Sequence, residues 1–332
     1  MRFLVTGATG FIGGALAARL LARGDRVRAL VRDPARAGEL SRLGAELAPG
    51  ALDDAPCLAR AVDGCDVVLH LAGLVKARRA SELFAVNRDG TANLARACAG
   101  AATAPRLVHV SSIAAAGPSS PSRARSEDDA PAPVSDYGRS KLAGEEAVRA
   151  VAGAVRVSIV RPPIVYGPGD KELVPPTLAL ARAGLVLRAG SASKRFSIVH
   201  VADLCDGIIQ VAERGKRLGA TGGEGVYFLD DGVEHAWEEI GRAACAALGR
   251  RPRVVALPEV LTYALAAGAT AAAALRGGVA MMSFDKIREL KQPSWTCTSA
   301  RARREVGYAP KVGLADGMRD AVAWQAAHRS AA

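Results

Sequence analysis

The chain has 332 residues, half of them hydrophobic and 23% charged, which is the composition of a folded protein with a sizeable core and not of a disordered chain. Its formal net charge of +11 comes mainly from arginines that are scattered along the sequence. Because these arginines form no clustered stripe and accompany no nucleic-acid motif, we expect no nucleic-acid partner.

Cysteine and histidine spacing gives no sign of a disulfide framework or a metal site. The six cysteines lie far apart without a CxxC pair, and the five histidines never stand at ligand spacing. This pattern predicts reduced thiols, a cytoplasmic location and no bound metal. A strand pattern begins at the N-terminus, so we expect no signal peptide.

Alternating strand and helix patterns run through the first half of the chain. We expect strands at Arg2–Thr6, Arg26–Val31, Asp66–Leu71, Arg106–Ser111 and Arg156–Val160, and helices at Ile12–Arg23, Ser81–Ala99 and Asp136–Ala152. Such alternation predicts parallel strands with right-handed crossovers, hence a doubly wound sheet. The segment Gly117–Val134, rich in proline, serine and mixed charge, is expected to be a long loop of the kind that often serves as a lid.

The regular alternation ends near Gly167. We predict an α/β fold with a Rossmann domain of residues 1–167, to which the chain returns at about 196–230, and a smaller, mainly helical substrate domain of residues 168–195 and 231–332. Val260–Leu275 is apolar but shorter than the ~20 residues of a membrane span. We therefore expect no transmembrane segment, and we favour a substrate-domain helix over peripheral contact with lipid.

A glycine-rich loop follows the first strand in the sequence Thr6-Gly-Ala-Thr-Gly-Phe-Ile-Gly13. Glycines in this pattern permit a tight turn, a close approach to a pyrophosphate and close helix packing. The N-terminus of the next helix then faces the phosphates. We predict that the cofactor is contacted by Gly7, Thr9, Gly10, Phe11, Ile12 and Gly13.

The end of the second strand, VRALVRDP, indicates which dinucleotide binds. Where an NAD enzyme usually has a carboxylate for the ribose 2′-hydroxyl, this chain has Val31 followed by Arg32. An arginine fork pairs well with a 2′-phosphate, and Arg28 and Arg36 can add positive charge. We therefore favour NADP(H) over NAD(H). The alternative is that Arg32 is an ordinary surface residue and Asp33 contacts the ribose.

The sequence Tyr137-Gly-Arg-Ser-Lys141 puts a phenol and an ammonium on one face of a helix. A free tyrosine ionises near pH ~10, and a neighbouring lysine together with a positively charged oxidised nicotinamide would lower that pKa. Ser111 and Ser112 end the strand VHVSS, at the sheet edge where ligands bind in such folds. A serine hydroxyl there can hold a carbonyl oxygen for hydride transfer.

Seven motifs occur in the order and approximate spacing of one enzyme family: TGATGFIG, DVVLHLAG, FAVNRDGTANL, VSS, YGRSK, RPPIVYGPGD and FSIVHVADL. Together with the ending SWTCTSARARREVGYAPKVGLADGMRDAVAW, they make nearly the whole chain resemble the extended short-chain dehydrogenase/reductases, the NAD-dependent epimerase/dehydratase family. The resemblance implies that Ser112, Tyr137 and Lys141 are catalytic. With Tyr137 and Lys141, we expect the cofactor to meet Arg32, Leu52, Leu71, Ala72, Gly73, Asn87, Ser111, Pro162, Ile164 and Val165.

One motif departs from the family pattern at the adenine. Members commonly carry Gly-Asp-Leu after the third strand, whereas this chain has Gly50-Ala51-Leu52-Asp53-Asp54. Either Asp53 substitutes for the missing carboxylate or the adenine rests on apolar contacts alone.

Two further positions bear on the substrate. Phe196 stands where sugar-nucleotide members have an arginine for the diphosphate, with Arg195 one residue off, and Pro162-Pro163 replaces an asparagine that contacts the substrate. Both changes remove polar contacts, and the pattern is more similar to the dihydroflavonol reductase and 3β-hydroxysteroid dehydrogenase branch.

We therefore expect an NAD(P)-dependent enzyme that interconverts a ketone and a secondary alcohol on a largely apolar small molecule, such as a steroid, terpenoid, lipid or flavonoid. A nucleotide-sugar epimerase or dehydratase is the first alternative, and a non-catalytic nucleotide-binding subunit is the second. A homodimer is compatible with the sequence.

Overall fold

The computed structural model describes residues 1–189, 194–258 and 284–329. Its central element is a seven-stranded parallel sheet in the order β3-β2-β1-β4-β5-β6-β10. The chain runs outward from β1 to β3, then returns to β4 and runs the other way, so the expected doubly wound sheet is confirmed. The strands are β1 Arg2–Thr6, β2 Arg26–Val31, β3 Glu46–Pro49, β4 Val67–His70, β5 Arg106–Val110, β6 Val157–Arg161 and β10 Val226–Phe228.

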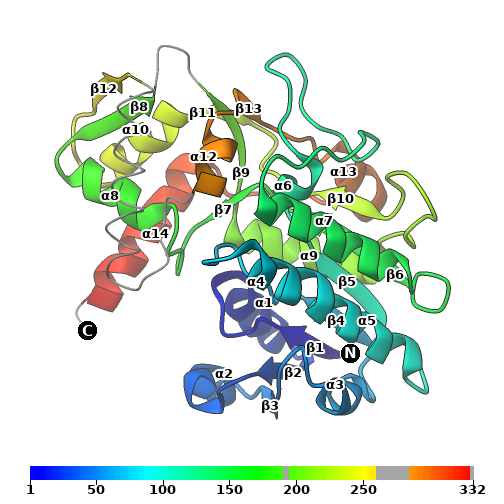
Figure 1. The fold of residues 1–332 in the computed structure, drawn as a ribbon. Coiled ribbons are helices and arrows are strands. Elements are labelled where there is room, and N and C mark those ends of the chain that lie inside the picture. Colours follow the sequence, from blue (N-terminus) through cyan, green and yellow to red (C-terminus); the bar gives the residue numbers. More distant parts are fainter. Residues whose placement is uncertain (190–193, 259–283, 330–332) are drawn as a thin grey trace.

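Helices cover both faces of this sheet. Successive strand residues point to opposite sides, so each face presents its own set of side chains to the helices that cover it. Phe3 and Val5 of β1 pack with α1, α9 and α13, whereas Leu4 packs with α3, α5 and α7 (Figure 1). Burial on both faces explains the continuous apolar runs of the strands. The helices are α1 Phe11–Ala22, α9 Val201–Arg214 and α13 Ala300–Val306 on one face, and α3 Ala55–Val62, α5 Thr91–Gly100 and α7 Asp136–Arg149 on the other.

Two smaller sheets lie beside the main one (Figure 1). In the first, β9 is flanked by β11 and β13 and also pairs with β7; in the second, β8 pairs with β12. This part of the chain therefore combines its helices with short strands. Its elements are β7 Ile164–Tyr166, α8 Val174–Arg182, β8 Leu185–Ala189, β9 Arg195–His200, β11 Glu234–Ala236, α10 Trp237–Ala247, β12 Arg253–Leu257, α12 Phe284–Leu290, β13 Ser294–Trp295 and α14 Leu314–Arg329.

The predicted elements of the first half are present, and most differ only at their ends. The exception is Ser81–Ala99, predicted as one helix, which is divided into α4, a π-helical turn η2 and α5. Short elements complete the fold: η1 Pro34–Ala37, α2 Gly38–Arg42, α4 Ala80–Phe84, η2 Ala85–Gly90 and α6 Ile113–Ala116.

The remaining expectations for the second half are resolved only in part. The chain leaves the main sheet after β6 and rejoins it with α9 and β10, while the exact domain boundaries stay a prediction. Val260–Leu275 lies outside the described residues. Within the described ranges, no helix combines the length and apolar character needed to cross a bilayer.

The long loop between α6 and α7 is anchored and does not resemble a free lid. The hydroxyl of Ser119 donates to that of Ser294 at 2.8 Å, and the backbone N–H of Arg125 donates to the carbonyl of Thr296 at 2.9 Å. The loop is thus held by β13 and the residues that follow it, which belong to the C-terminal part of the chain.

Candidate active site

The glycine-rich loop between β1 and α1 is shaped to receive a pyrophosphate. Gly7 has a φ of +72°, which a residue with a side chain adopts only under strain, and a Cβ at Gly13 would collide with the carbonyl oxygen of Gly7. No side chain caps α1, so the N–H groups of its first turn are left for another partner. These features fit the phosphates of a dinucleotide.

A buried polar chain joins this loop to the segment after β4. The hydroxyl of Thr6 accepts a hydrogen bond from the backbone N–H of Ala72 at 3.1 Å and lies 2.7 Å from Nδ1 of His70. Nε2 of His70 lies 2.8 Å from the hydroxyl of Thr91. The chain therefore brings the predicted contacts Leu71 and Ala72 beside the glycine loop.

Asn87 links the same segment to α7. Its side-chain oxygen accepts from the N–H of Leu74 at 2.8 Å, and its amide donates to the carbonyl of Leu74 and to the hydroxyl of Ser140. A Cβ at Gly73 would lie 3.0 Å from Oδ1 of Asn87 and 3.7 Å from Nζ of Lys141. The structure thus brings together three predicted residues, while the side chain of Asn87 serves to hold the loop in place.

Gly144 is a residue that the sequence interpretation missed. A Cβ at this position of α7 would collide with the backbone carbonyl oxygen of Asn87. The glycine lets α7 lie directly against η2, and a glycine inside a helical segment is a sequence signal for such close packing.

Tyr137 and Lys141 both lie on α7, and Ser112 faces them from the end of β5. Nζ of Lys141 donates to the carbonyl of Val110 at 2.8 Å. The hydroxyl of Ser112 accepts from the N–H of Ala114 at 3.1 Å and interacts with the phenol of Tyr137, which lowers the pKa of that phenol in part. The predicted serine, tyrosine and lysine therefore gather at the carboxyl edge of the sheet.

Burial controls the protonation of this pair. Removal from water raises the pKa of Tyr137 to about 12, and the negative charge of Glu289 acts in the same direction. Removal from water also lowers the pKa of Lys141 to about 8, against the opposing charge of Glu145. We expected Lys141 and an oxidised nicotinamide together to lower the pKa of Tyr137, and that combined effect stays a prediction; in the protein alone, removal from water is the largest influence on the pKa of the phenol.

Ser111 points away from the phenol into the core. Its hydroxyl donates to Glu145 at 2.6 Å, and Glu145 accepts from the guanidinium of Arg161 at 2.6 and 2.8 Å. The side chains of Arg161 and Glu145 are 3% and 1% exposed. This buried ion pair is joined through Ser111 to the end of β5, next to Ser112, and any contact of Ser111 with the cofactor would involve its backbone.

The polar side chains in and after β2 differ in whether they already bind other groups of the protein. Arg32 and Arg36 are exposed and make no side-chain hydrogen bond or ion pair with the described part of the chain. Arg28 is engaged, since its guanidinium binds Glu46 at 2.8 Å and the carbonyls of the α3 end, so it does not add charge for a phosphate as we expected. Asp33 accepts from the N–H of Ala35 at 3.0 Å and caps η1.

The other predicted contacts lie along the same edge. The carbonyl of Leu52 accepts from Asn93 at 2.8 Å. Asp54 caps α3, whereas Asp53 is exposed. The carbonyl of Pro162 accepts from the backbone N–H of Ile113, the residue after Ser112, at 2.9 Å. This hydrogen bond places the segment leading to Ile164 and Val165 beside the serine.

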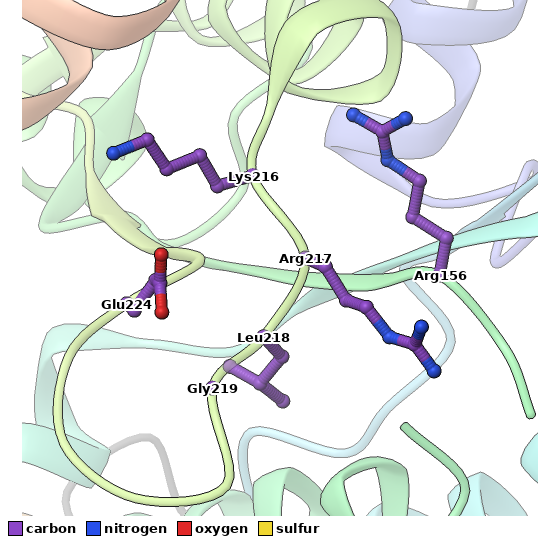
Figure 2. A pocket seen from close by; sticks show the side chains of 6 residues that line it. All are labelled: Arg156, Lys216, Arg217, Leu218, Gly219 and Glu224. Carbon is purple, nitrogen blue, oxygen red and sulfur yellow. The ribbon is translucent and has the colours of Figure 1, made fainter. Parts of the chain in front are cut away.

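A surface hollow of 590 Å³ lies elsewhere, at the amino edge of the sheet (Figure 2). Arg156, which lines it, precedes β6, whereas Ser112 follows the carboxyl end of β5. The side chains of Arg156, Lys216 and Arg217 point in different directions, and both guanidinium groups donate to backbone carbonyls. They do not converge on one ligand position.

Known proteins share this sequence and fold. The sequence profile of the NAD dependent epimerase/dehydratase family matches residues 3–222. A ceramide reductase from Caulobacter vibrioides is 36% identical over 96% of this chain and 93% of that protein. A 4-hydroxy-2-methyl-3-oxo-4-farnesyl-3,4-dihydroquinoline-1-oxide ketoreductase from Stigmatella aurantiaca is 32% identical over 96% and 95%. A dTDP-glucose 4,6-dehydratase double mutant from Streptomyces venezuelae, solved with NAD bound, has a TM-score of 0.77 and 26% identity over 99% of this chain and 98% of that one.

The chain therefore belongs to the NAD-dependent epimerase/dehydratase family, within the extended short-chain dehydrogenases/reductases, as the motifs predicted. It is an NAD(P)-dependent oxidoreductase of that type.

The ion pair behind the serine generates a stability prediction. In the Glu145→Gln variant, Arg161 is left buried without its counter-charge, so we expect a loss of about 3–5 kcal/mol in the free energy of unfolding. Urea unfolding followed by circular dichroism measures it. Asp316→Asn, which affects an exposed ion pair with Arg319, is the control and should change stability by less than about 1 kcal/mol. Equal unfolding midpoints for the two variants would contradict the role of burial.

The lowered pKa of Lys141 generates a pH prediction. The ammonium is present below about pH 8 and lost above it, so we expect the rate of the reaction at this site to fall as the pH rises through about 8. The pH profile of kcat/KM measures this. In Lys141→Arg the side chain stays charged, and whatever activity remains should no longer decline there. A wild-type profile that stays flat well above pH 8 would show that this proton is not needed.

Proposed function

We propose that this protein is an NADP(H)-dependent ketoreductase that acts on a largely apolar ketone. The observation that carries the proposal is the apolar cluster that adjoins Ser112. Ile113, the next residue, packs in one cluster with Phe196 and Trp295, and Trp237 stacks edge-on against Phe196 with ring centroids 5.4 Å apart. Such a wall favours apolar substrate atoms beside the serine.

The register of β9 supports the same substrate class. Phe196 is 7% exposed within this cluster, whereas the guanidinium of Arg195 donates to the carbonyl of Glu234 at 3.4 Å, since neighbouring strand residues face opposite sides. Neither residue offers a cation to a substrate diphosphate at this wall. A diphosphate would forgo charge-assisted hydrogen bonds of about 1.5–3 kcal/mol each.

The proposed mechanism assigns one task to each residue of the site. Ser112 and Tyr137 hydrogen-bond the carbonyl oxygen of the substrate and orient it. When bound, the reduced nicotinamide supplies a hydride to the carbonyl carbon. Tyr137 donates its proton to the oxygen, for which its raised pKa suits it. Lys141, beside Gly73, holds the nicotinamide ribose and places a positive charge near the phenol.

The preference for NADP(H) rests on the side chains after β2. Arg32 is exposed and has no side-chain partner among the residues that the structure describes, while Asp33 is used to cap η1. A free guanidinium at the end of the second strand suits a 2′-phosphate. The cytoplasmic location, the homodimer and the two-domain division remain predictions.

A substrate test decides between this proposal and its alternatives. We expect NADPH to be consumed with at least one of a long-chain 3-oxo lipid, a ketosteroid and a dihydroflavonol. Tyr137→Phe should lower kcat by about 10²–10⁴-fold while the NADPH dissociation constant changes little. Conversion of UDP-glucose or dTDP-glucose without net use of cofactor would favour the epimerase or dehydratase. Full turnover by Tyr137→Phe would refute the assigned role of the phenol.

The cofactor preference has its own test. Arg32→Gln removes the charged partner of the 2′-phosphate, so KM for NADPH should rise by about 10–100-fold, as expected for charge-assisted bonds of ~1.5–3 kcal/mol. KM for NADH should stay within about twofold. Arg26→Gln, an exposed arginine at the opposite end of β2, is the control and should change neither value. An equal rise for both cofactors would contradict recognition of the phosphate.

A further inference from the structure

The first turn of α7, the helix that carries Tyr137, is capped by a distant segment. The carboxylate of Asp285, on α12, accepts the backbone N–H of Asp136 at 2.6 Å and that of Tyr137 at 3.0 Å. The helix's own cap, Ser135, accepts the N–H of Gly138 at 2.9 Å. The free N–H groups at this helix end are thus shared between a local serine and a carboxylate 148 residues further along the chain.

A second carboxylate of α12 completes the contact. Glu289 is 8% exposed, and it accepts from the hydroxyl of Ser135 at 2.7 Å and from Lys286 at 2.7 Å. Its backbone carbonyl accepts from the indole N–H of Trp295 at 2.9 Å. Trp295 belongs to the apolar wall beside Ser112, so α12 connects that wall to the start of the catalytic helix.

We propose that Asp285 and Glu289 are positioning residues of the active site, which fix the place of the Tyr137 phenol and keep it protonated for delivery to the substrate. The inference rests on the proposed ketoreductase function and deepens it. Neither residue touches the reacting atoms; both act through the first turn of α7.

Geometry supports the positioning part. Tyr137 is the second residue of α7, and its own N–H is one of the two that Asp285 holds. Loss of that contact would free the first turn, whereas Lys141, one turn later, is fixed separately by the carbonyl of Val110. A small displacement of a reacting group relative to its partners is enough to slow catalysis strongly.

Electrostatics supports the protonation part. The positive end of a helix dipole stabilises an anion, so an uncompensated N-terminus of α7 would favour the phenolate of Tyr137. Two carboxylates hydrogen-bonded at that end oppose this effect, while Arg139, Lys286 and Arg288 are more exposed. The buried cation, Lys141, lies one turn further along α7 and donates to the carbonyl of Val110. The charged groups at this helix end are Asp136, Arg139 and Lys141 on α7, and Asp285, Lys286, Arg288 and Glu289 on α12.

The test uses the full chain with Asp285→Asn and Glu289→Gln, which keep the side-chain shape and remove the charge. With a ketone that the wild type reduces, Asp285→Asn should lower kcat by about 10–100-fold, because the first turn is loosened. The NADPH dissociation constant should stay within about twofold. Asp316→Asn, which affects the exposed ion pair with Arg319 on α14, is the matched control and should leave both values unchanged.

A second readout separates positioning from simple stabilisation. The ionisation of Tyr137, measured as the ultraviolet difference between each protein and its Tyr137→Phe counterpart, should occur at lower pH in Asp285→Asn and Glu289→Gln than in the wild type. A merely structural cap would lower stability without moving this ionisation. Unchanged kcat and unchanged ionisation in both variants would overturn the proposal, and so would a fall in kcat without any movement of the ionisation.

The outcome also stays distinct from that of the proposed function. If the wild type reduces none of the ketones, the ketoreductase proposal fails. The ionisation of Tyr137 needs no substrate, so it still decides whether the two carboxylates of α12 control the phenol.

Discussion

The close packing of α7 against the turn η2 is the contact on which the site depends. Gly144 has no side chain to keep the helix away from the carbonyl oxygen of Asn87, so the two backbones lie against each other. Asn87 in turn holds the segment after β4, and that segment meets the glycine loop through Thr6. The segments that follow β1 and β4 are thereby held in place relative to α7, the helix that carries Tyr137 and Lys141. A side chain at 144 would move Lys141 and Tyr137 together, away from Gly73 and Ser112.

The protonation of the site follows from burial more than from neighbouring charge. The sequence suggests that a lysine four residues from a tyrosine will lower the pKa of the phenol. In water, the positive charge of the lysine is the only influence that it has on the phenol. In the structure the loss of hydration acts on both groups in the direction of neutrality. The hydrogen bond from Ser112 offsets this only in part for Tyr137. Both shifts therefore favour the neutral forms of the phenol and of the amine in the protein alone.

Local patterns were sufficient for five of the seven strands of the sheet, for the glycine loop and for the placing of Tyr137 and Lys141 on one helix. Each of these depends on neighbours in sequence: apolar runs, glycines at fixed spacing, and a four-residue step on one helix. The division of Ser81–Ala99 by η2 was not predictable in this way, because it accompanies the contact of Asn87 with distant groups. The ion pair of Glu145 with Arg161 and the capping of α7 by Asp285 were missed for the same reason. Their partners meet only after the sheet has formed.

The substrate is the property that the fold itself leaves undetermined. The fold is similar to that of a dTDP-glucose 4,6-dehydratase, and the sequence is similar to those of a ceramide reductase and a farnesyl-dihydroquinoline-oxide ketoreductase, so the architecture alone does not determine the substrate. The choice of substrate therefore depends on single residues around the site, and β9 shows how small a change in sequence position is enough to alter it. Since strand residues alternate in direction, a shift of one residue in this strand would exchange Phe196 for Arg195 at the wall beside Ser112. The pairing of β9 with both β11 and β13 holds that register, and with it the apolar character of the wall.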